Sequence, residues 1–284
     1  MSASPGPVAL VTGCSTGIGR ATAFLLARSG YRVFATVRTP EAEASLRTDA
    51  AGLSLEILRK DFLEEDAAST LVQEVLGRAG RMDVLVNNAG YALLGAVEDL
   101  RAEAVRRQFQ VNVFAPVQLS RAVLPTMRAQ RYGRIVNVSS MAGRVSVPLM
   151  GAYCASKFAR EAFSDSLRAE AKPFGVRVSL VEPGPVATEF NRTAVAASRE
   201  ILEARSPYRA VYQDYLDDFS TLGAATPQQA ARTILKAIRA ARPRSRYRVR
   251  AREALLAGIV QLVPKGAMDF ATIRFMGLQK LGRS

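Results

Sequence analysis

The sequence predicts an α/β fold in which a doubly wound parallel sheet forms a single domain. From Val8 to Val181, apolar runs of strand length alternate with longer amphipathic segments, the pattern of parallel strands covered by helices on both faces. A glycine-rich segment follows the first apolar run, as expected where a strand turns tightly into a helix. No repeat or Pro/Ser-rich linker divides the 284 residues, a length that suits one large domain.

Each element is expected where the hydrophobic pattern and the turn residues agree. Strands are predicted at Val8–Thr12, Arg32–Val37, Leu53–Leu58, Asp83–Val86, Arg134–Val138 and Val176–Val181. Helices are predicted between them at Ile18–Ser29, Asp66–Ala79, Ala102–Gln130 and Met150–Lys172. After Pro183 the pattern changes. The segment from Thr188 to Gly223 is expected to be mostly helical, followed by a helix at Pro227–Arg239 and a last strand at Arg246–Arg250.

Composition limits the chemistry that the chain can perform. The chain has no histidine, which excludes Ser-His-Asp and Cys-His nucleophile systems, His-ligated zinc and a histidine pH switch. Its two cysteines are too few for a disulfide framework, which predicts a reducing, cytoplasmic location. No window is long and apolar enough to predict a membrane span, and Met1 to Pro7 does not resemble a signal peptide. The net charge of +14 predicts attraction to polyanions, without choosing among nucleic acid, anionic lipid and phosphate-bearing ligands.

The glycine-rich turn after the first strand is a candidate phosphate-binding site. Its glycines let a pyrophosphate approach the backbone N–H groups at a helix N-terminus. The spacing differs from G-x-G-x-x-G, and a tight turn would explain the glycines if the motif stood alone. The residues predicted to contact a dinucleotide here are Gly13, Ser15, Thr16, Gly17, Ile18 and Gly19.

Ligands of an open parallel sheet bind at the carboxyl ends of its strands. Strand two leads into Arg38, where NAD-binding folds usually place an acid against the ribose 2′-hydroxyl. A guanidinium suits a 2′-phosphate, so NADP(H) is favoured over NAD, the alternative being a solvated surface arginine. The next two strands lead into short polar groups that can hold an adenosine, although Asx-turns alone would also explain them. These residues are Asp61, Phe62, Asn88, Ala89 and Gly90.

A tyrosine and a lysine four residues apart are the best candidates for proton chemistry. Tyr153 and Lys157 project from one helix face, and a nearby ammonium stabilises a phenolate. Without histidine, Tyr153 is the best-placed general acid/base. Such a pair alone is usually helix surface, so the prediction depends on Ser140 at the end of strand five and on the glycine-rich turn. Asn112 lies in an apolar helical stretch, where an asparagine that satisfies the backbone is the ordinary explanation.

Together these residues resemble the short-chain dehydrogenase/reductase family, over about Val8 to Thr188. The family's marks occur here as Thr12–Gly19, Asp61, Asn87–Gly90, Asn112, Ser140, Tyr153-x-x-x-Lys157 and Pro183-Gly184. The resemblance implies a Rossmann-like fold and an NADP(H)-dependent oxidoreductase acting on an alcohol or a carbonyl group.

The resemblance also implies a role for each matched residue. Tyr153 is expected to exchange the proton with the substrate, and Ser140 to hydrogen-bond the reacting oxygen. Lys157 is expected to bind the nicotinamide ribose and to lower the tyrosine pKa, and Asn112 to hold the water of a proton relay. The residues expected to seat the nicotinamide are Pro183, Gly184, Val186 and Thr188.

Within the family, the turn around Cys14 and the segment Tyr153–Ala159 are most similar to the 17β-hydroxysteroid and retinol dehydrogenase branch. The implied substrate is a lipophilic small-molecule carbonyl compound or alcohol of steroid, retinoid or fatty type. Two alternatives remain. One is a 3-oxoacyl carrier-protein reductase, whose acidic carrier a basic surface would suit. The other is a catalytically silent NADP(H)-binding sensor or scaffold, which the intact catalytic residues disfavour.

We expect residues 1–252 to form the dinucleotide-binding domain, with a helical substrate lid over 188–223, and 253–284 to form a C-terminal amphipathic extension. An aromatic stripe on the lid suits either an apolar substrate or packing on the domain. Its members are Tyr208, Tyr212, Tyr215 and Phe219. Small side chains at helical spacing from Ala152 to Ala169 indicate close contact with another helix, and the resemblance implies a homodimer or tetramer.

Arginine occupies every second position from Arg242 to Arg252, so on a strand these side chains would line one face. A solvated sheet edge is the prediction, with a lipid-binding patch as an alternative. No nucleic-acid motif accompanies the arginines, so no nucleic acid is expected. The apolar residues beyond them have basic neighbours, which leaves three roles for the extension: covering the substrate cleft, joining subunits, or peripheral contact with a membrane surface.

Overall fold

One parallel sheet organises the molecule. The computed structural model describes residues 6–212, 225–250, 259 and 263–281. Within them, seven strands form a sheet in the order β3-β2-β1-β4-β5-β6-β7, and all its neighbours run parallel. Their bounds are β1 Val8–Val11, β2 Arg32–Val37, β3 Leu55–Arg59, β4 Val84–Asn87, β5 Gly133–Val138, β6 Val176–Glu182 and β7 Arg246–Arg248. The predicted doubly wound sheet is confirmed, and its winding reverses between β1 and β4, where ligands of such sheets bind.

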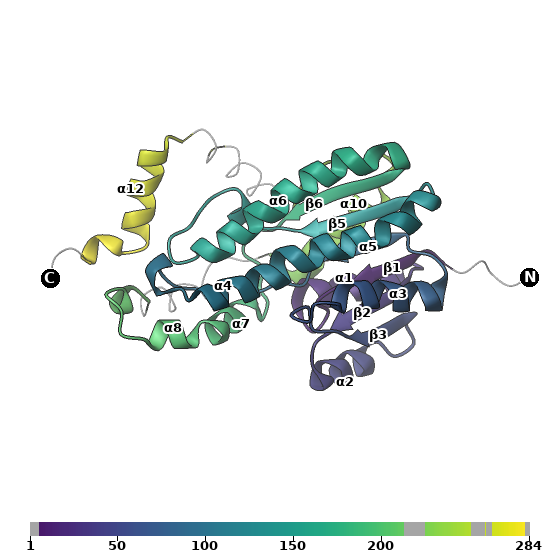
Figure 1. Cartoon of the computed structure of the whole chain (residues 1–284), viewed down its shortest axis with the longest axis horizontal. Helices are drawn as coiled ribbons and strands as arrows, with labels where there is room; N and C mark the ends of the chain where they lie inside the picture. Colours follow the sequence, from purple (N-terminus) through teal and green to yellow (C-terminus); the bar gives the residue numbers. More distant parts are fainter. Residues whose placement is uncertain (1–5, 213–224, 251–258, 260–262, 282–284) are drawn as a thin grey trace, which may run out of the picture.

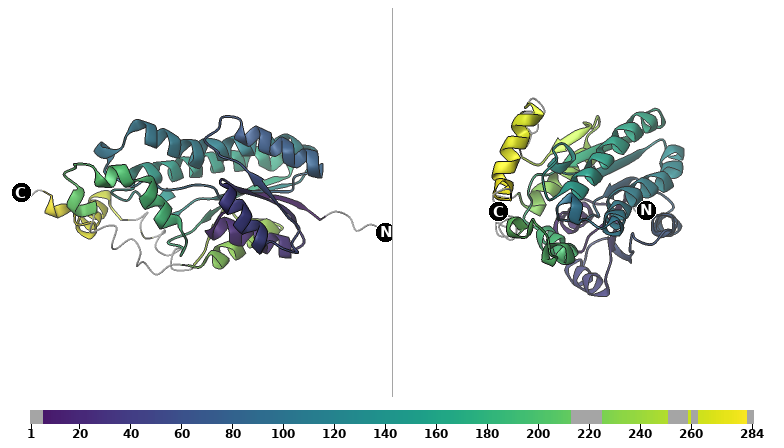
Figure 2. Two further views of the ribbon diagram at one scale, coloured as in Figure 1. Left: turned by 90° about the horizontal axis from the view of Figure 1, so that it is seen from below. Right: turned by 60° about the vertical axis from the view of Figure 1, so that its left-hand side comes forward.

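Helices cover both faces of the sheet, as Figure 2 shows in its left-hand view. One layer consists of α1 (Gly17–Arg28), α2 (Pro40–Asp49) and α10 (Pro227–Arg239). The other consists of α3 (Ala67–Ala79), α4 (Ala102–Phe109), α5 (Ala115–Ala129) and α6 (Gly151–Ala171). Successive strand residues enter opposite layers, so that Leu10 packs with α3 and α5 while Val11 packs with α1 and α10.

Two elements differ from the predictions. The sequence analysis did not predict α2, because only Leu46 of this helix is buried and the apolar periodicity is weak. Its start is fixed instead by Thr39, whose hydroxyl accepts from the Ala42 N–H, and by Pro40 in the first turn. The long helix predicted over 102–130 is divided, because a π-helical segment, Gln110–Phe114, separates α4 from α5.

Three of the helices that follow β6 lie beyond the carboxyl ends of the strands. Figure 1 shows α7 (Phe190–Ala197), α8 (Arg199–Glu203) and α12 (Lys265–Phe275) at the end of the molecule away from the N-terminus. Tyr215 and Phe219 of the predicted aromatic stripe lie outside the described residues. Among the helices that the structure describes, none is long and apolar enough to cross a membrane.

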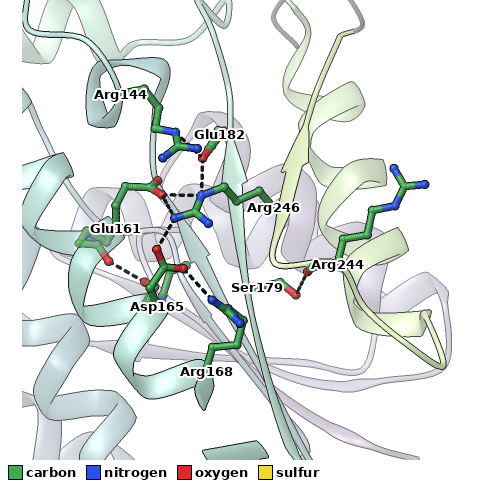
Figure 3. A network of polar contacts seen from close by, with 11 residues as sticks. Arg144, Glu161, Asp165, Arg168, Ser179, Glu182, Arg244 and Arg246 are labelled. Atoms are coloured by element: carbon green, nitrogen blue, oxygen red, sulfur yellow. Dashed lines mark hydrogen bonds and ion pairs between the residues drawn. The ribbon is translucent and has the colours of Figure 1, made fainter. Parts of the chain in front are cut away.

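The arginine-rich segment forms the edge strand β7, but two of its arginines do not line a solvated edge. Arg246 lies against three carboxylates, with its Nε 3.0 Å from Glu182 Oε1 and its NH2 3.0 Å from Glu161 Oε2 (Figure 3). Arg248 Nε is 3.2 Å from the other oxygen of Glu182, a side chain with no exposed surface. These buried acids, supplied by β6 and α6, draw the arginines inward, so the prediction of a solvated face is wrong for Arg246 and Arg248.

Candidate active site

A large cavity of about 2720 Å³ lies at the carboxyl ends of the strands. Its walls include the glycine-rich turn, Arg38, Ser140, the pair Tyr153 and Lys157, and the segment after β6. The structure therefore brings almost all of the predicted site residues to one place. The two that do not line the cavity are Gly19 and Asn112.

The glycine-rich turn is shaped by close backbone packing. Gly13 and Gly17 have φ values of 72° and 59°, a region that L side chains rarely adopt. A Cβ on Gly19 would lie 2.1 Å from the Gly13 carbonyl oxygen, so only glycine fits behind the turn. The helix that follows, α1, has no side-chain cap from Thr16 and no acid in its first turn. Its N-terminal N–H groups at the cavity therefore fit the phosphates of a dinucleotide.

Asn88 stabilises this turn through hydrogen bonds. Its Nδ2 donates to the carbonyls of Thr12 (2.9 Å) and Gly13 (3.0 Å), and its backbone N–H donates to Thr12 Oγ1 (3.0 Å). The sequence analysis expected Asn88 to contact an adenosine. In the structure its Nδ2 is hydrogen-bonded to the turn, and Asn88 also lines the cavity, so this contact stays a prediction.

The part of the cavity next to β2 and β3 is lined by Arg38, Asp61 and Phe62. Arg38 is exposed and directly follows the buried Val37, the last residue of β2. Asp61 Oδ1 accepts from the Leu63 N–H at 3.0 Å, the Asx-turn considered from the sequence. The three residues thus lie where the ends of β2 and β3 meet.

Tyr153, Ser140 and Lys157 together line another part of the cavity. Burial raises the pKa of Tyr153 to about 12, while a hydrogen bond with Ser140 and the positive charge of Arg160 act to lower it. Lys157 Nζ donates to the Val138 carbonyl at 3.1 Å and lies 5.5 Å from the centroid of the Tyr153 ring. Burial holds the pKa of Lys157 well below its usual range.

Asn112 lies behind this wall, in the π-helical segment, and is fully buried. Its Nδ2 donates to the Tyr91 carbonyl at 2.9 Å and to Ser156 Oγ at 3.0 Å, and its Oδ1 accepts from the Tyr91 N–H at 3.1 Å. The side chain therefore ties the segment after β4 to α6, the helix that carries Tyr153.

One residue of the site was missed from the sequence. Arg160 is 3% exposed and donates to four backbone carbonyls around Lys157. Its position seven residues after Tyr153, on the same helix face as Lys157, was the available signal. An arginine in so basic a chain is ordinarily a surface residue, and for that reason it was not singled out.

The wall beside Tyr153 is apolar. Leu149, Met150 and Tyr212 are buried with Tyr153 in one cluster, and the Phe190 ring lies 5.7 Å from the Tyr153 ring. Met276, from the turn after α12, belongs to the same cluster and lines the cavity. The described part of the C-terminal extension thus contributes to the wall of this cavity.

Comparisons with known proteins agree with this arrangement. A family model described as "short chain dehydrogenase" matches residues 7–199. The "Probable short-chain type dehydrogenase/reductase VdlC" of Helicobacter pylori is 34% identical, covering 92% of this chain and 95% of that protein. Retinol dehydrogenase 8 of Bos taurus is 35% identical, with 93% of this chain and 88% of that protein covered. Human 17-beta-hydroxysteroid dehydrogenase type 1 is 36% identical, with 84% and 76% covered.

Solved structures share the fold over most of the chain. A short chain dehydrogenase/reductase from Burkholderia phymatum, in complex with NAD, superposes with a TM-score of 0.78 at 27% identity, covering 89% of this chain and 92% of that one. A metagenomic short-chain oxidoreductase, in complex with NADP, gives a TM-score of 0.69 at 32% identity, with 86% and 97% covered. One of these two structures therefore contains NAD, and the other contains NADP.

Proposed function

This chain belongs to the short-chain dehydrogenase/reductase family, and from that premise we propose that it is an NADP(H)-dependent oxidoreductase acting on a lipophilic ketone, aldehyde or alcohol. The observation that carries the proposal is that Tyr153, Ser140 and Lys157 line the same cavity as a glycine-rich helix N-terminus. A titratable hydroxyl thus lies in the same cleft as a site suited to a dinucleotide.

In the proposed mechanism, the chain's own residues handle the proton. For reduction, the Tyr153 hydroxyl donates a proton to the carbonyl oxygen, which Ser140 holds by a second hydrogen bond. Burial favours the protonated tyrosine, as this direction requires. When bound, NADPH supplies the hydride. Lys157, within reach of the same part of the cavity, is proposed to hold the nicotinamide ribose.

The preference for NADP(H) over NAD is proposed from Arg38. No acidic residue lies at the end of β2 in Val37-Arg38-Thr39, and the exposed guanidinium lines the cavity where a ribose 2′-phosphate would lie. The NADP-bound structural relative, at 32% identity, supports the choice, although the chain is also similar to the NAD-bound one.

A lipophilic substrate is proposed from the apolar cluster beside Tyr153. Met150, Phe190 and Met276 line the cavity and belong to the same apolar cluster as Tyr153. The relatives named for retinol and for a 17β-hydroxysteroid support a substrate of this chemical class. We further propose that residues 1–252 form the dinucleotide-binding domain and that residues 253–284 form an extension that covers this part of the cleft. We also propose that the protein is a homo-oligomer.

A screen with a catalytic control tests the proposal. Purified protein is incubated with NADPH and a panel of steroid, retinoid, fatty and aromatic carbonyl compounds, and NADPH consumption is followed. We expect turnover on at least one large apolar carbonyl compound, falling at least about a hundredfold in Tyr153→Phe because the proton donor is removed.

NADPH affinity measured by fluorescence titration is the internal control. It should stay within a few fold in the variant, since the substitution removes one hydroxyl. NADPH binding without turnover across the whole panel would favour the sensor or scaffold, and unchanged turnover in folded Tyr153→Phe would refute the mechanism.

A further inference from the structure

Arg160 is a buried cation held by backbone carbonyls. Its Nε and NH2 donate to the Asn112 carbonyl at 3.0 and 2.6 Å, and its NH1 donates to the carbonyls of Val138 (2.8 Å) and Asn87 (3.2 Å). No carboxylate of the described residues lies within ion-pair distance of this guanidinium. A buried arginine with only neutral acceptors is costly, so its position calls for a local reason.

The surrounding backbone provides acceptors that regular structure leaves available. Asn112 precedes Pro116 by four residues, and a proline has no N–H to donate to that carbonyl in the ordinary helical pattern. Asn87 and Val138 are the last residues of β4 and β5. The π-helical segment and the two strand ends thus together form a cradle for one guanidinium.

The same cradle holds Lys157. Its Nζ and the Arg160 NH1 both donate to the Val138 carbonyl, at 3.1 and 2.8 Å. The two nitrogens therefore lie within about 6 Å of each other, the range in which like charges act strongly on an ammonium group. Tyr153, Lys157 and Arg160 occupy positions i, i+4 and i+7 of α6, so they form one stripe on the helix.

We infer that Arg160 is a positioning residue of the catalytic centre, whose guanidinium supplies the fixed positive charge beside Tyr153 and Lys157. This inference rests on the proposed function of Tyr153. A guanidinium keeps its proton to higher pH than an ammonium at the same place, so Arg160 carries its charge over a wider pH range than Lys157. It also contacts the Asn112 carbonyl, which joins Asn112 to the centre without requiring Asn112 to contact the substrate.

The electrostatic effects of the neighbouring groups agree with this inference. The Arg160 charge lowers the pKa of Tyr153 and adds to the lowering of the Lys157 pKa by burial. Burial lowers the pKa of Arg160 itself to about 10, which leaves it charged at neutral pH.

Other titratable groups act on the same centre. Glu161 of α6 acts on Lys157 in the opposite sense, and Cys154 of the same helix raises the pKa of Tyr153. From the elements packed against α6, Ser140 hydrogen-bonds Tyr153, and Glu182 of β6 acts on Glu161.

Titration of Lys157 by NMR tests the inference without any substrate. The chain has six lysines, so ¹³C,¹⁵N-labelled lysine gives a simple spectrum in which Lys157→Met identifies the Lys157 side-chain signal. In the wild-type protein we expect this signal to titrate below the ordinary value of about 10.4. Arg160→Gln, which keeps two N–H donors and removes the charge, should raise the Lys157 pKa by about one unit or more.

Two further variants separate charge from structure. Arg160→Lys keeps the charge and should leave the Lys157 pKa within about half a unit of wild type. Arg168→Gln removes an arginine of the same helix that pairs instead with Asp165, and should have no effect.

An ordinary wild-type Lys157 pKa would overturn the inference, as would equal changes in the Lys157 pKa in Arg160→Gln and Arg160→Lys, or no change in folded Arg160→Gln. If circular dichroism shows that Arg160→Gln is unfolded, Arg160→Met, which also removes the charge, is titrated in its place. A Lys157 pKa that rises in Arg160→Met but not in Arg160→Lys supports the inference, and no rise in folded Arg160→Met overturns it.

The pH profile of alcohol oxidation provides the functional readout. Arg160→Gln removes the positive charge that lowers the Tyr153 pKa, so the acidic limb of the kcat/KM profile should move to higher pH. At a fixed pH on that limb, kcat/KM should fall about tenfold when the limb moves by about one pH unit. Arg160→Lys should restore most of this loss. A lower rate with an unmoved limb would mean that Arg160 is only structural.

Absence of turnover in the wild-type protein would count against the proposed function alone, because the lysine titration does not depend on turnover.

Discussion

Arg38 is the residue on which the proposed cofactor preference depends. It is exposed at the cavity wall, whereas the preceding residue, Val37, is 2% exposed and packs in the core below. An acid placed at Val37 would therefore disturb folding, and the informative substitution is at Arg38 itself. We expect Arg38→Ala to weaken NADPH binding by about tenfold or more while NADH binding changes little, since a charge-assisted contact to phosphate is lost.

Fluorescence titration with both reduced cofactors measures this change. The control is Arg47→Ala, because Arg47 is an exposed arginine of α2 whose side chain pairs with Glu43. If both affinities fall equally in Arg38→Ala, or if the wild-type protein already prefers NADH, Arg38 does not bind a 2′-phosphate.

At the same scale, the sequence predicted the residues that face the cavity better than those that support them. Tyr153, Lys157 and the glycine-rich turn follow patterns of residue type and spacing that chemistry alone restricts. Asn88 and Arg160 act through backbone carbonyls, and which carbonyls lie nearby depends on how β1, β4 and the π-helical segment meet. A contact of that kind has no signature in the spacing of residues.

Elements were predicted well where apolar periodicity was strong. The strands β1, β2, β5 and β6 lie within one residue of their predicted ends, because their side chains are buried on both faces. The π-helical segment was not predicted, because the contacts made there by Asn112, with Tyr91, Ser156 and Arg160, are tertiary and leave no mark in the apolar periodicity. The edge strand β7 was predicted, but the direction of its arginines was not, because their acidic partners come from β6 and α6.

The acidic network gives a prediction about β7. Arg246 lies against Glu161 and Glu182, whose side chains are 7% and 0% exposed. Arg246→Met would leave these carboxylates with less compensation, so we expect the free energy of unfolding to fall by about 3–5 kcal/mol. Urea denaturation followed by circular dichroism measures the change.

Two further variants provide the controls for this measurement. Arg242→Met, at an exposed arginine of the same segment, should change the free energy of unfolding by less than about 0.5 kcal/mol. Adding Glu161→Gln to Arg246→Met should recover part of the loss, because the carboxylate that loses its arginine partner is then removed. A loss in Arg246→Met no larger than that in Arg242→Met would show that the network does not hold the edge strand.

For the whole molecule, the exposed side of α6 predicts self-association. Phe158 and Phe163 are 42% and 49% exposed on this helix, and Phe114 of the adjacent π-helical segment is 48% exposed. Small neighbours such as Ala155 and Ala162 would allow a second helix to approach closely. We expect sedimentation velocity to show a homo-oligomer that Phe163→Asp dissociates, because a carboxylate would be buried at the contact. Phe270→Asp, on the exposed side of α12, is the control, and a wild-type monomer would contradict the prediction.

The C-terminal extension leads to the last prediction. Residues Arg274 to Lys280 contribute to the cavity wall, and Met276 is buried in the same cluster as Tyr153 and Leu149. All the predicted catalytic and cofactor-binding residues lie upstream, at or before Thr188, so a truncation after Arg252 should still bind NADPH with nearly unchanged affinity.

The truncation should, however, lose part of the apolar wall of the substrate cleft. Burial of one large apolar side chain contributes about 1.5–3 kcal/mol, so the KM for a large apolar ketone should rise by about tenfold or more. The KM for a small ketone, which cannot reach Met276, should change much less. Steady-state kinetics with one ketone of each size, in the truncated and the full-length protein, make the comparison. An equal rise in KM for both ketones would show that the extension does not contact the substrate. Loss of NADPH binding through unfolding would instead make it part of the domain core, because the cluster around Tyr153 would then depend on Met276 to form.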